Sequence, residues 1–378
     1  MKDFYPYITN DGSVGLYSKE FDDIYHSTYG AYAEAWEKFV LPADLDFYFK
    51  NYKEINVLDI CYGIGYNTKS LVQKYYNDTI HSDNIKLNIK AVDSDKELMF
   101  LSPFFTCCAK RKPKHENLPT EKVKHLSSDK IEKQYEYDNF INLILIEKLA
   151  QKFPDFLTKD FLKKEYSAFF DKMSVNLYKN RIADTPLRAL NAFLHNIYYL
   201  NISTRYKKAL KALKIGAFDI DYACDDARKV VKEDNKVYQL IFLDAFTPVK
   251  CPCLWSVDFF KLLYQRLDDN GRILTYSNSA QVRNAFQAAG FYVGKIFNER
   301  AGKFTGTIAV KNSSFIYYPL SEYDLSLMKT RAGIFYRDEN LNALNEAIIE
   351  RHKIEVENSP LISSSKFIKE YRKEHQNV

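Results

Sequence analysis

The sequence predicts an α/β fold built on a doubly wound, mostly parallel sheet, and three observations support that prediction. Apolar segments of strand length alternate with helical patterns over residues 55–100 and again over 216–311. Glycines at Gly63 and Gly65 lie between the first of these strands and the helix after it. Acidic residues stand at strand ends, which is where open α/β sheets bind ligands.

The first hundred residues supply the first half of this sheet. The elements expected there are a hairpin turn at Asn10–Asp11–Gly12, a strand at Val14–Tyr17, one helix over 31–50 with Ala31, Ala35, Trp36 and Phe39 on one face, and a strand–helix–strand unit at Val57–Ile60, Thr68–Tyr76 and Ile85–Val92.

The alternation resumes after residue 215 and completes the sheet. The strands expected there are Phe218–Tyr222, Gln239–Leu243, Arg272–Tyr276, Phe291–Phe297 and Gly306–Val310. The helices expected between them are Ala227–Glu233, Ser256–Leu267 with Ser256 as its cap, and Ser279–Ala289 closed by Gly290. A turn is expected at Asp269–Asn270–Gly271, before the third of these strands.

Four regions follow from these patterns. Residues 1–100 hold the N-terminal hairpin and the first half of the sheet, and 216–311 hold the second half. Residues 101–215 are too long for a loop and predict a helical insertion, with helical patterns over 138–153, 159–178 and 185–215. Residues 312–378 form a C-terminal extension, with one helix expected near 340–356.

Composition excludes several classes of protein. The 378 residues carry a net charge of +5, from 54 basic and 49 acidic side chains, which does not by itself indicate nucleic acid. No segment reaches the roughly 20 apolar residues that span a bilayer, and Met1–Ser13 does not look like a signal peptide. The six cysteines lack the spacing of a disulfide framework or a zinc site. We therefore expect a cytoplasmic protein with reduced thiols, no membrane contact and no metal.

The glycine turn over 57–67 narrows the range of cofactors that the chain could bind. A dehydrogenase pattern would need a third glycine at Thr68, and no phosphate-binding P-loop is present. The methyltransferase pattern acid-x-Gly-x-Gly-x-Gly fits, with Asp59 as the acid and Cys61 in place of the first glycine. The Asp59 carboxylate can accept from the ammonium of S-adenosylmethionine, and Asp93 can accept from both ribose hydroxyls. Asp226 can accept from the adenine amino group.

Each of these signals also has a purely structural interpretation. A glycine-x-glycine turn after a strand is weak on its own and indicates only a nucleotide. Asp226 could cap the helix that follows it, and Asp244 could be a turn residue before Pro248.

Four separated motifs make the chain resemble the methyltransferase domain of the bacterial MnmC family. They are Glu20-Phe-Asp-Asp-Ile-Tyr-His-Ser27, Asp59-Ile-Cys-Tyr-Gly-Ile-Gly-Tyr-Asn67, Phe242-Leu-Asp-Ala-Phe-Thr-Pro-Val-Lys-Cys-Pro252 with Leu254-Trp255, and Ile273-Leu-Thr-Tyr-Ser277 followed by Val282-Arg283 and Ala289-Gly-Phe291. The third is the most specific. The resemblance covers about residues 5–100 and 217–311, and implies the class I fold of S-adenosylmethionine-dependent methyltransferases.

The resemblance also implies a role for each site residue. Cofactor binding falls to Tyr25, Asp59, Gly63, Gly65, Asn67, Asp93 and Asp226. Asp244, with the substrate-adjacent Phe246, Pro248 and Lys250, would lie where the methyl donor meets the acceptor. Our own hypothesis is that Asp244 orients the acceptor amine and helps to accept its proton. Apart from the resemblance, the basic side chains at Lys110–Lys114, Arg205–Lys214, Lys250, Arg283 and Lys303 are candidates for phosphate contacts, although those at 205–214 could be only the solvated face of a helix. Departures from the family pattern stand at Cys61, Ala245, Thr247 and Cys251.

The implied reaction is N-methylation of 5-aminomethyl-(2-thio)uridine at the wobble position of tRNA, giving 5-methylaminomethyl-(2-thio)uridine. The partner would be the tRNA anticodon loop. Because only about 67 residues follow residue 311, with no second glycine pattern, we expect neither FAD nor the oxidase activity of larger family members. Two alternatives stay open. One is an aminopropyltransferase-like polyamine enzyme, because the loop after Asp244 is similar in that class. The other is a catalytically inactive tRNA-binding protein.

Overall fold

The computed structural model describes residues 4–20, 22–79, 85–105, 141–142, 144–153 and 218–375. The chain divides into two compact units. Unit 1 comprises residues 1–36, 62–88 and 95–222, and unit 2 comprises residues 37–61, 89–94 and 223–378. The four-region division expected from the sequence stays a prediction.

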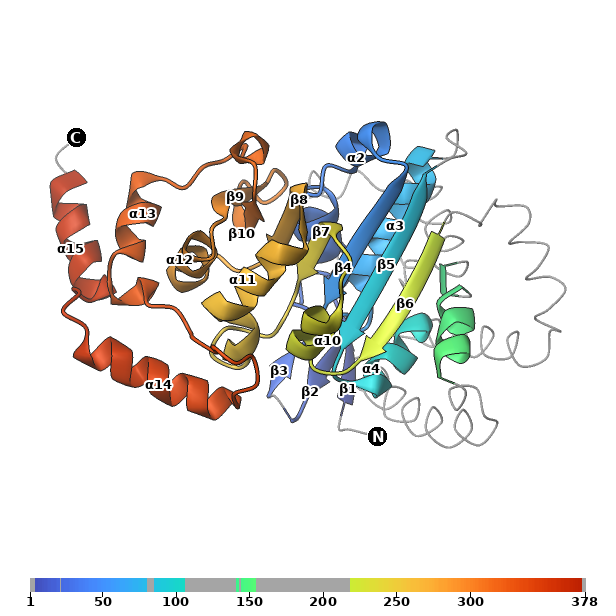
Figure 1. Ribbon diagram of the computed structural model, residues 1–378, viewed down its shortest axis with the longest axis horizontal. Coiled ribbons are helices and arrows are strands. Elements are labelled where there is room, and N and C mark those ends of the chain that lie inside the picture. Colours follow the sequence, from blue (N-terminus) through green and yellow to red (C-terminus); the bar gives the residue numbers. More distant parts are fainter. Residues whose placement is uncertain are drawn as a thin grey trace, which may run out of the picture. The chain divides into compact units, whose positions relative to one another are not determined.

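Within the described ranges, the central sheet has seven strands in the order β6-β5-β4-β7-β8-β10-β9. Their bounds are Glu54–Ile60 for β4, Lys86–Asp93 for β5, Phe218–Cys224 for β6, Tyr238–Leu243 for β7, Leu267–Thr275 for β8, Tyr292–Asn298 for β9 and Lys303–Val310 for β10. Strand β7 runs parallel to β4 and β8, whereas β10 is antiparallel to β8 and β9. Figure 1 shows β4, β7 and β8 side by side. The predicted mostly parallel α/β fold is confirmed.

The core of unit 2 forms around β7, which is buried along its whole length. A strand covered on both faces must be apolar throughout, and this explains the continuous run from Tyr238 to Leu243. Helices α11 (Val257–Arg266) and α12 (Ala280–Ala288) belong to this core, where Phe260 and Phe286 stack with ring centroids 3.8 Å apart. The predicted cap is confirmed, because the Ser256 hydroxyl accepts from the amide of Phe259 at 3.2 Å.

Unit 1 carries the predicted N-terminal hairpin. Strand β1 (Phe4–Ile8) pairs antiparallel with β2 (Val14–Ser18), and β2 pairs with the short β3 (Asp23–Ile24). The same unit contains α3 (Tyr66–Thr79) and α4 (Lys96–Leu101). The Tyr66 hydroxyl donates to the Val14 carbonyl and accepts from the Val14 amide, both at 3.0 Å. The hairpin is thereby attached to the helix that follows the glycine turn.

The single helix expected over 31–50 is wrong. The chain forms α1 (Ala31–Ala35), continues as a π-helix over Trp36–Val40, breaks, and resumes as α2 (Leu45–Asn51). Pro42 in the break lacks an amide hydrogen and disfavours helical backbone at the residue before it. Asp44 then adopts a left-handed conformation with φ 52°. Its carboxylate pairs with the buried Arg272 guanidinium at 2.8 Å, which holds the break in place.

The turn expected at 269–271 is also wrong, because these residues lie within β8. The pairing of β8 with β7 is irregular there: Tyr238 pairs with Leu267, but Leu240 pairs with Arg272. The extra residues form an irregular segment that the Asp268 carboxylate holds, accepting from the Asn270 amide at 2.9 Å and the Tyr52 hydroxyl at 2.8 Å.

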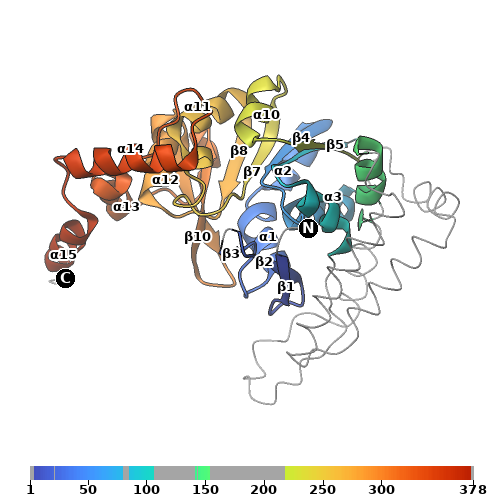
Figure 2. The ribbon, with the colours of Figure 1, turned by 90° about the horizontal axis from the view of Figure 1, so that it is seen from below.

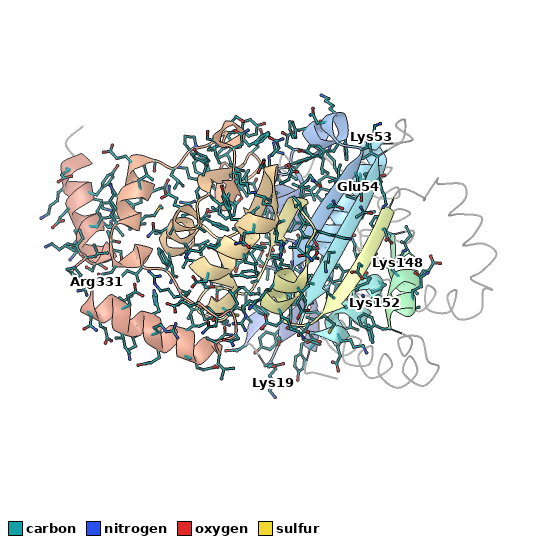
Figure 3. All side chains as sticks on the ribbon, viewed as in Figure 1. Lys19, Lys53, Glu54, Lys148, Lys152 and Arg331 are labelled. Atoms are coloured by element: carbon teal, nitrogen blue, oxygen red, sulfur yellow. The ribbon has the colours of Figure 1, made fainter. Side chains whose placement is uncertain are left out.

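The sequence pattern indicates one α-helix in the C-terminal extension, whereas its described residues, 312–375, form three. They are α13 (Glu322–Met328), α14 (Asn345–Asn358) and α15 (Ser364–His375), and α14 is the helix expected near 340–356. Helix α14 contacts α12 where Gln281 and His352 lie 3.0 Å apart. Figure 2 shows these two helices side by side. Arg331, labelled in Figure 3, donates to the carbonyls of Ser359 and Leu361.

Part of the expected helical insertion lies within the described residues. Residues 141–142 and 144–152 are helical, in agreement with the pattern over 138–153. Lys148 and Lys152, labelled in Figure 3, pair with Asp219 at 2.6 Å and Asp221 at 2.8 Å on β6. The other two expected helices lie outside the described residues. None of the described helices is long and apolar enough to cross a membrane.

Candidate active site

Three acidic side chains stand at the carboxyl ends of neighbouring strands, as the sequence predicts. Asp59 is the penultimate residue of β4, pairs in register with Phe242 of β7, and is fully buried. Asp93 is the last residue of β5, with 9% of its surface exposed. Asp244 directly follows β7, and its amide donates to the Ile60 carbonyl at 3.2 Å. This is the edge of the sheet where the fold class binds ligands.

Cys61 directly follows β4, at the same end of the strand as Asp59 and within unit 2. Desolvation holds the pKa of its thiol well above the ordinary value, and the nearby carboxylates of Asp93, Asp244 and Asp59 act in the same direction, as does Cys253. Cys61 has φ 63°, a left-handed conformation that glycine adopts without strain. The residue that departs from the glycine pattern therefore keeps the backbone shape that the pattern requires.

The glycine turn continues from Cys61 into unit 1. Gly63 and Gly65 have φ 56° and 78°, so both occupy the left-handed region. A Cβ atom on Gly65 would overlap the Tyr62 hydroxyl. The Gly65 amide donates to the Tyr62 carbonyl at 2.9 Å, and the Gly65 carbonyl accepts from Lys69 at the start of α3. Asn67, in the first turn of α3, is buried. The turn is thus shaped by its two glycines.

Tyr25 lies directly after β3 in unit 1. Its amide donates to the Leu16 carbonyl at 2.8 Å, and its ring lies edge-on to Phe4 with centroids 6.0 Å apart. The next residue, His26, packs edge-on against Tyr66 at 5.2 Å. The N-terminal motif and the helix after the glycine turn are therefore in contact within this unit.

Asp226 caps α10 (Ala227–Glu233), which confirms the structural role considered for it. Its Oδ1 accepts from the Arg228 amide at 2.8 Å. The Arg228 guanidinium also grips the carboxylate, with Nη2 2.6 Å from Oδ2 and Nε 3.1 Å from each oxygen. A carboxylate oxygen can accept a further hydrogen bond, so this geometry is compatible with a ligand contact.

The loop from Asp244 to Trp255 is held by side chains that hydrogen-bond its backbone. The Tyr276 hydroxyl donates to the Ala245 carbonyl at 2.9 Å, and Trp255 Nε1 donates to the Phe246 carbonyl at 2.8 Å. Trp255 is fully buried and packs edge-on against Tyr276 at 6.0 Å. These bonds fix the two residues directly after Asp244.

The second part of this loop turns back on itself. The Thr247 carbonyl accepts from the amides of Lys250 at 2.8 Å and Cys251 at 3.0 Å. Phe246, Pro248 and Lys250 are partly buried, whereas Val249 at the tip is exposed. Trp255 and Tyr276 stand within the sequence motifs, but the motifs predict no role for them. Their role depends on hydrogen bonds to main-chain carbonyls, and a motif does not record such bonds.

Four cysteines lie in the part of the chain that the structure describes. Cys61, Cys224, Cys251 and Cys253 are free there, and the sulfurs of Cys251 and Cys253 are 3.8 Å apart. Across the described residues, no group of three or more acidic, histidine or cysteine side chains could hold a metal ion.

The basic residues expected to contact phosphate differ in where the structure places them. Arg283 is buried, and its guanidinium is engaged by Thr307, Asp324 and Asn278 at 3.1, 2.9 and 2.9 Å. It therefore supports the fold, and its assignment to phosphate contact is corrected. Lys250 and Lys303 lie on the described surface. The runs at 110–114 and 205–214 lie outside the described residues.

Comparison with known proteins defines the class. Residues 189–312 match the family described as S-adenosyl-L-methionine-dependent methyltransferase. The crystal structure of MNMC2 from Aquifex aeolicus superposes with a TM-score of 0.58 and 21% identity, covering 94% of this chain and 86% of that one, and shows the same fold. The chain is thus an S-adenosylmethionine-dependent methyltransferase with the class I α/β fold.

Sequence relatives place it further within that class. The chain is 26% identical over 344 residues to the uncharacterized protein MJ0670 of Methanocaldococcus jannaschii, covering 90% of this chain and 69% of that protein. Two proteins named tRNA 5-methylaminomethyl-2-thiouridine biosynthesis bifunctional protein MnmC match shorter parts. The Burkholderia multivorans protein is 40% identical over 55 residues, and the Burkholderia vietnamiensis protein is 34% identical over 89.

Those two matches cover 15% and 24% of this chain, and only 8% and 14% of the bifunctional proteins. Together with the four sequence motifs and the fold, they confirm the resemblance of this methyltransferase to the MnmC type.

Proposed function

We propose that the protein transfers a methyl group from S-adenosylmethionine to the primary amine of 5-aminomethyl-(2-thio)uridine at the wobble position of tRNA. The product is 5-methylaminomethyl-(2-thio)uridine. The observation that carries this proposal is the position of Asp59, Asp93 and Asp244 at the carboxyl ends of the neighbouring strands β4, β5 and β7, with Asp244 opening the loop that most resembles the MnmC motif.

The cofactor half of the proposal rests on donor and acceptor chemistry. S-adenosylmethionine supplies an electrophilic methyl group on a sulfonium. Asp59 would accept from its ammonium and Asp93 from its ribose hydroxyls, because ionised carboxylates are strong acceptors. Asp226 would accept from the adenine amino group. The left-handed turn at Gly63 and Gly65 lets the main chain approach a ligand closely. Asn67 and Tyr25 complete the proposed set.

The acceptor half rests on the loop after Asp244. Bonds from Tyr276 and Trp255 fix the backbone at Ala245 and Phe246, so the Asp244 carboxylate is attached to a rigid support. Phe246 and Pro248 would form the sides of a slot for the uridine substituent. A preorganised carboxylate can orient an amine without the cost of ordering the loop at each turnover.

The reaction requires the protein to position the amine against the methyl group and to let the amine nitrogen lose one proton. An alkylammonium has no lone pair, so the amine must react in its neutral form. Its nitrogen forms the new bond to carbon as the carbon–sulfur bond breaks, and the nitrogen then sheds a proton. An aspartate is a weak base at neutral pH, so Asp244 acts chiefly by accepting a hydrogen bond from the amine. Solvent takes the proton from there.

The anticodon loop suits such a site because its bases can be splayed out of the stack. Phosphate contacts would come from the Lys250 and Lys303 side chains, and from the basic runs at 110–114 and 205–214. A protein that neutralises several phosphates loses affinity steeply as salt rises.

Nucleoside analysis of tRNA from a strain that lacks this protein tests the proposed function. We expect 5-aminomethyl uridine derivatives to accumulate and the methylated form to disappear. Restoring the protein should reverse both changes, whereas an Asp59→Ala variant should not. An unchanged nucleoside profile would reject the tRNA substrate.

The two alternatives give different outcomes with purified protein. An aminopropyltransferase would convert putrescine with the decarboxylated cofactor and leave tRNA unmodified. A catalytically inactive binder would retain tRNA and release no S-adenosylhomocysteine. The carboxylates at strand ends favour the methyltransferase over both.

A further inference from the structure

The C-terminal extension contains a segment that reaches back to the site. This segment, residues 336–345, follows α13, ends at the first residue of α14 and is called here the 336–345 strap. The Tyr336 carbonyl accepts from the amide of Val257 at 3.0 Å. The Asp338 amide donates to the Asp258 carboxylate at 2.8 Å. Both contacts fix the strap against the start of α11.

Asp338 is the centre of the strap. It is 1% exposed, and each of its carboxylate oxygens is engaged. Oδ1 accepts from the amides of Asn342 and Ala343 at 3.2 and 3.1 Å, and Oδ2 accepts from Arg228 Nη1 at 2.5 Å. A buried carboxylate needs such partners, because an unpaired buried charge is strongly destabilising. Its hydrogen bonds tie the strap to Arg228.

Arg228 connects Asp338 to Asp226. One side of its guanidinium binds the Asp338 carboxylate and the Ala343 carbonyl, the latter at 2.9 Å. The other side binds both oxygens of Asp226 through Nε and Nη2. The Arg228 side chain is 9% exposed, whereas that of Asp226 is 41% exposed. A half-exposed carboxylate would ordinarily sample several rotamers. The bidentate hydrogen bonds from the Arg228 guanidinium restrict the Asp226 side chain to one of them.

The strap also reaches the loop of the acceptor half. The Asn345 side chain, at its end, accepts from the Cys253 amide at 3.4 Å. Cys253 lies in the short helix over Pro252–Trp255 that contains the buried Trp255. One segment of the extension thus touches both the residue that holds Asp226 and the loop that carries Asp244.

We propose that Arg228 and Asp338 are positioning residues that set the Asp226 carboxylate for recognition of the adenine amino group. The C-terminal extension is then part of the cofactor site, and its 336–345 strap is the connecting element. This inference rests on the proposed function, in which Asp226 accepts from adenine.

The test compares S-adenosylmethionine with its analogue that carries hypoxanthine in place of adenine. The analogue presents an oxygen where adenine presents its amino group, so an oriented carboxylate should reject it. We expect the wild-type protein to prefer the adenine cofactor by about tenfold or more in kcat/KM, since hydrogen bonds to charged groups are of that strength. Asp338→Asn should raise the KM for S-adenosylmethionine about tenfold, leave kcat within about twofold, and abolish the preference.

Asp324→Asn is the matched control. Asp324 belongs to the same extension and pairs with the buried Arg283 at 2.9 Å, but it does not touch Arg228 or Asp226. A purely structural role for Asp338 would lower stability in both variants and change the base preference in neither. Arg228→Lys keeps the charge but loses the bidentate geometry of the guanidinium. It therefore tests the positioning of Asp226 if Asp338→Asn does not fold. It should weaken the preference as Asp338→Asn does.

The outcomes separate this inference from the function beneath it. One outcome is that the wild-type protein and the Asp324→Asn control both prefer adenine over hypoxanthine. If Asp338→Asn and Arg228→Lys then keep that preference unchanged, the positioning role is wrong and the proposed methyltransferase function stands. If the wild-type protein binds both cofactors equally, the adenine contact of Asp226 is wrong, and this inference fails with it. If it binds neither, the proposed function itself fails.

Discussion

At the scale of single residues, Cys61 decides how the glycine pattern should be interpreted. It stands where the methyltransferase pattern has its first glycine, yet it adopts φ 63°. For an L-residue the left-handed conformation costs roughly 1–2 kcal/mol relative to the right-handed one. The surrounding fold imposes it, so the departure from the pattern changes the side chain and not the course of the backbone.

The stability of variants at Cys61 should therefore depend on how well the new residue tolerates the left-handed backbone conformation. Cys61→Gly should unfold at nearly the same urea concentration as the wild-type protein and retain S-adenosylmethionine affinity. Cys61→Val should lower the free energy of unfolding by about 2 kcal/mol, because a β-branched residue is a genuine outlier at positive φ. Equal stability of the two variants would show that the left-handed conformation is not maintained in solution.

Asp244 allows a second test at the same scale. Asp244→Asn preserves size and removes charge, so we expect kcat to fall about tenfold or more while the KM for S-adenosylmethionine stays within about twofold. Asp244→Ala should be slower still. Steady-state kinetics with tRNA from a strain lacking the protein measures both. Wild-type kcat in the alanine variant would reduce Asp244 to a turn residue.

At the scale of elements, the sequence predicted what depends on neighbours along the chain. The buried strand β7, the cap at Ser256 and the glycine turn all follow from local pattern, and all are present. The break at Pro42 and the irregular pairing of β8 were missed. Pro42 is a local signal for the break, but the contacts that hold both features are remote in sequence: Arg272 binds Asp44 and Tyr52 binds Asp268 across more than 200 residues.

The candidate site divides in the same way. The acids at strand ends could be predicted, because an α/β alternation places the ends of parallel strands at one edge of the sheet. The residues that support them could not. Arg228 reaches Asp338 across 110 positions, and Trp255 acts through a main-chain carbonyl. No sequence spacing records either contact.

The loop element after Asp244 should lose rigidity if its indole donor is removed. Trp255→Phe keeps the ring in the core but deletes the 2.8 Å bond to the Phe246 carbonyl. We expect the free energy of unfolding to fall by about 1 kcal/mol, as for a typical intramolecular hydrogen bond, with an additional fall in kcat/KM for tRNA. Amide hydrogen exchange over 244–252 should accelerate. Unchanged exchange in that loop would show that Trp255 does not hold it.

At the scale of the whole molecule, ion pairs within unit 2 predict how stability depends on pH. Desolvation alone would raise the pKa of Asp234, but hydrogen bonds from Lys90, Tyr238 and the Lys236 amide bring it below the ordinary value. The Asp324 carboxyl behaves alike: desolvation opposes the shift, and hydrogen bonds from Ser321 and Lys295, with the charge of Arg283, lower its pKa.

A carboxylate whose pKa is lower in the folded state stabilises the protein above its unfolded-state pKa. That stability is lost as the pH falls through the folded-state pKa. We therefore expect the melting temperature to be steady from neutral pH to about pH 5 and to drop below about pH 4. Asp234→Asn should melt lower at neutral pH and show a shallower acid drop. A wild-type melting temperature that rises on acidification would contradict the ion-pair assignment.

The most direct test of the central claim is a reaction with purified components. The protein would be incubated with S-adenosylmethionine and tRNA that carries 5-aminomethyl-2-thiouridine, followed by mass spectrometry of the nucleosides. The account predicts a wobble nucleoside heavier by one methylene, with S-adenosylhomocysteine released in equal amount and no product from Asp59→Ala. Release of S-adenosylhomocysteine with the wobble nucleoside unchanged would contradict the substrate, and no release with any tRNA would contradict the methyltransferase itself.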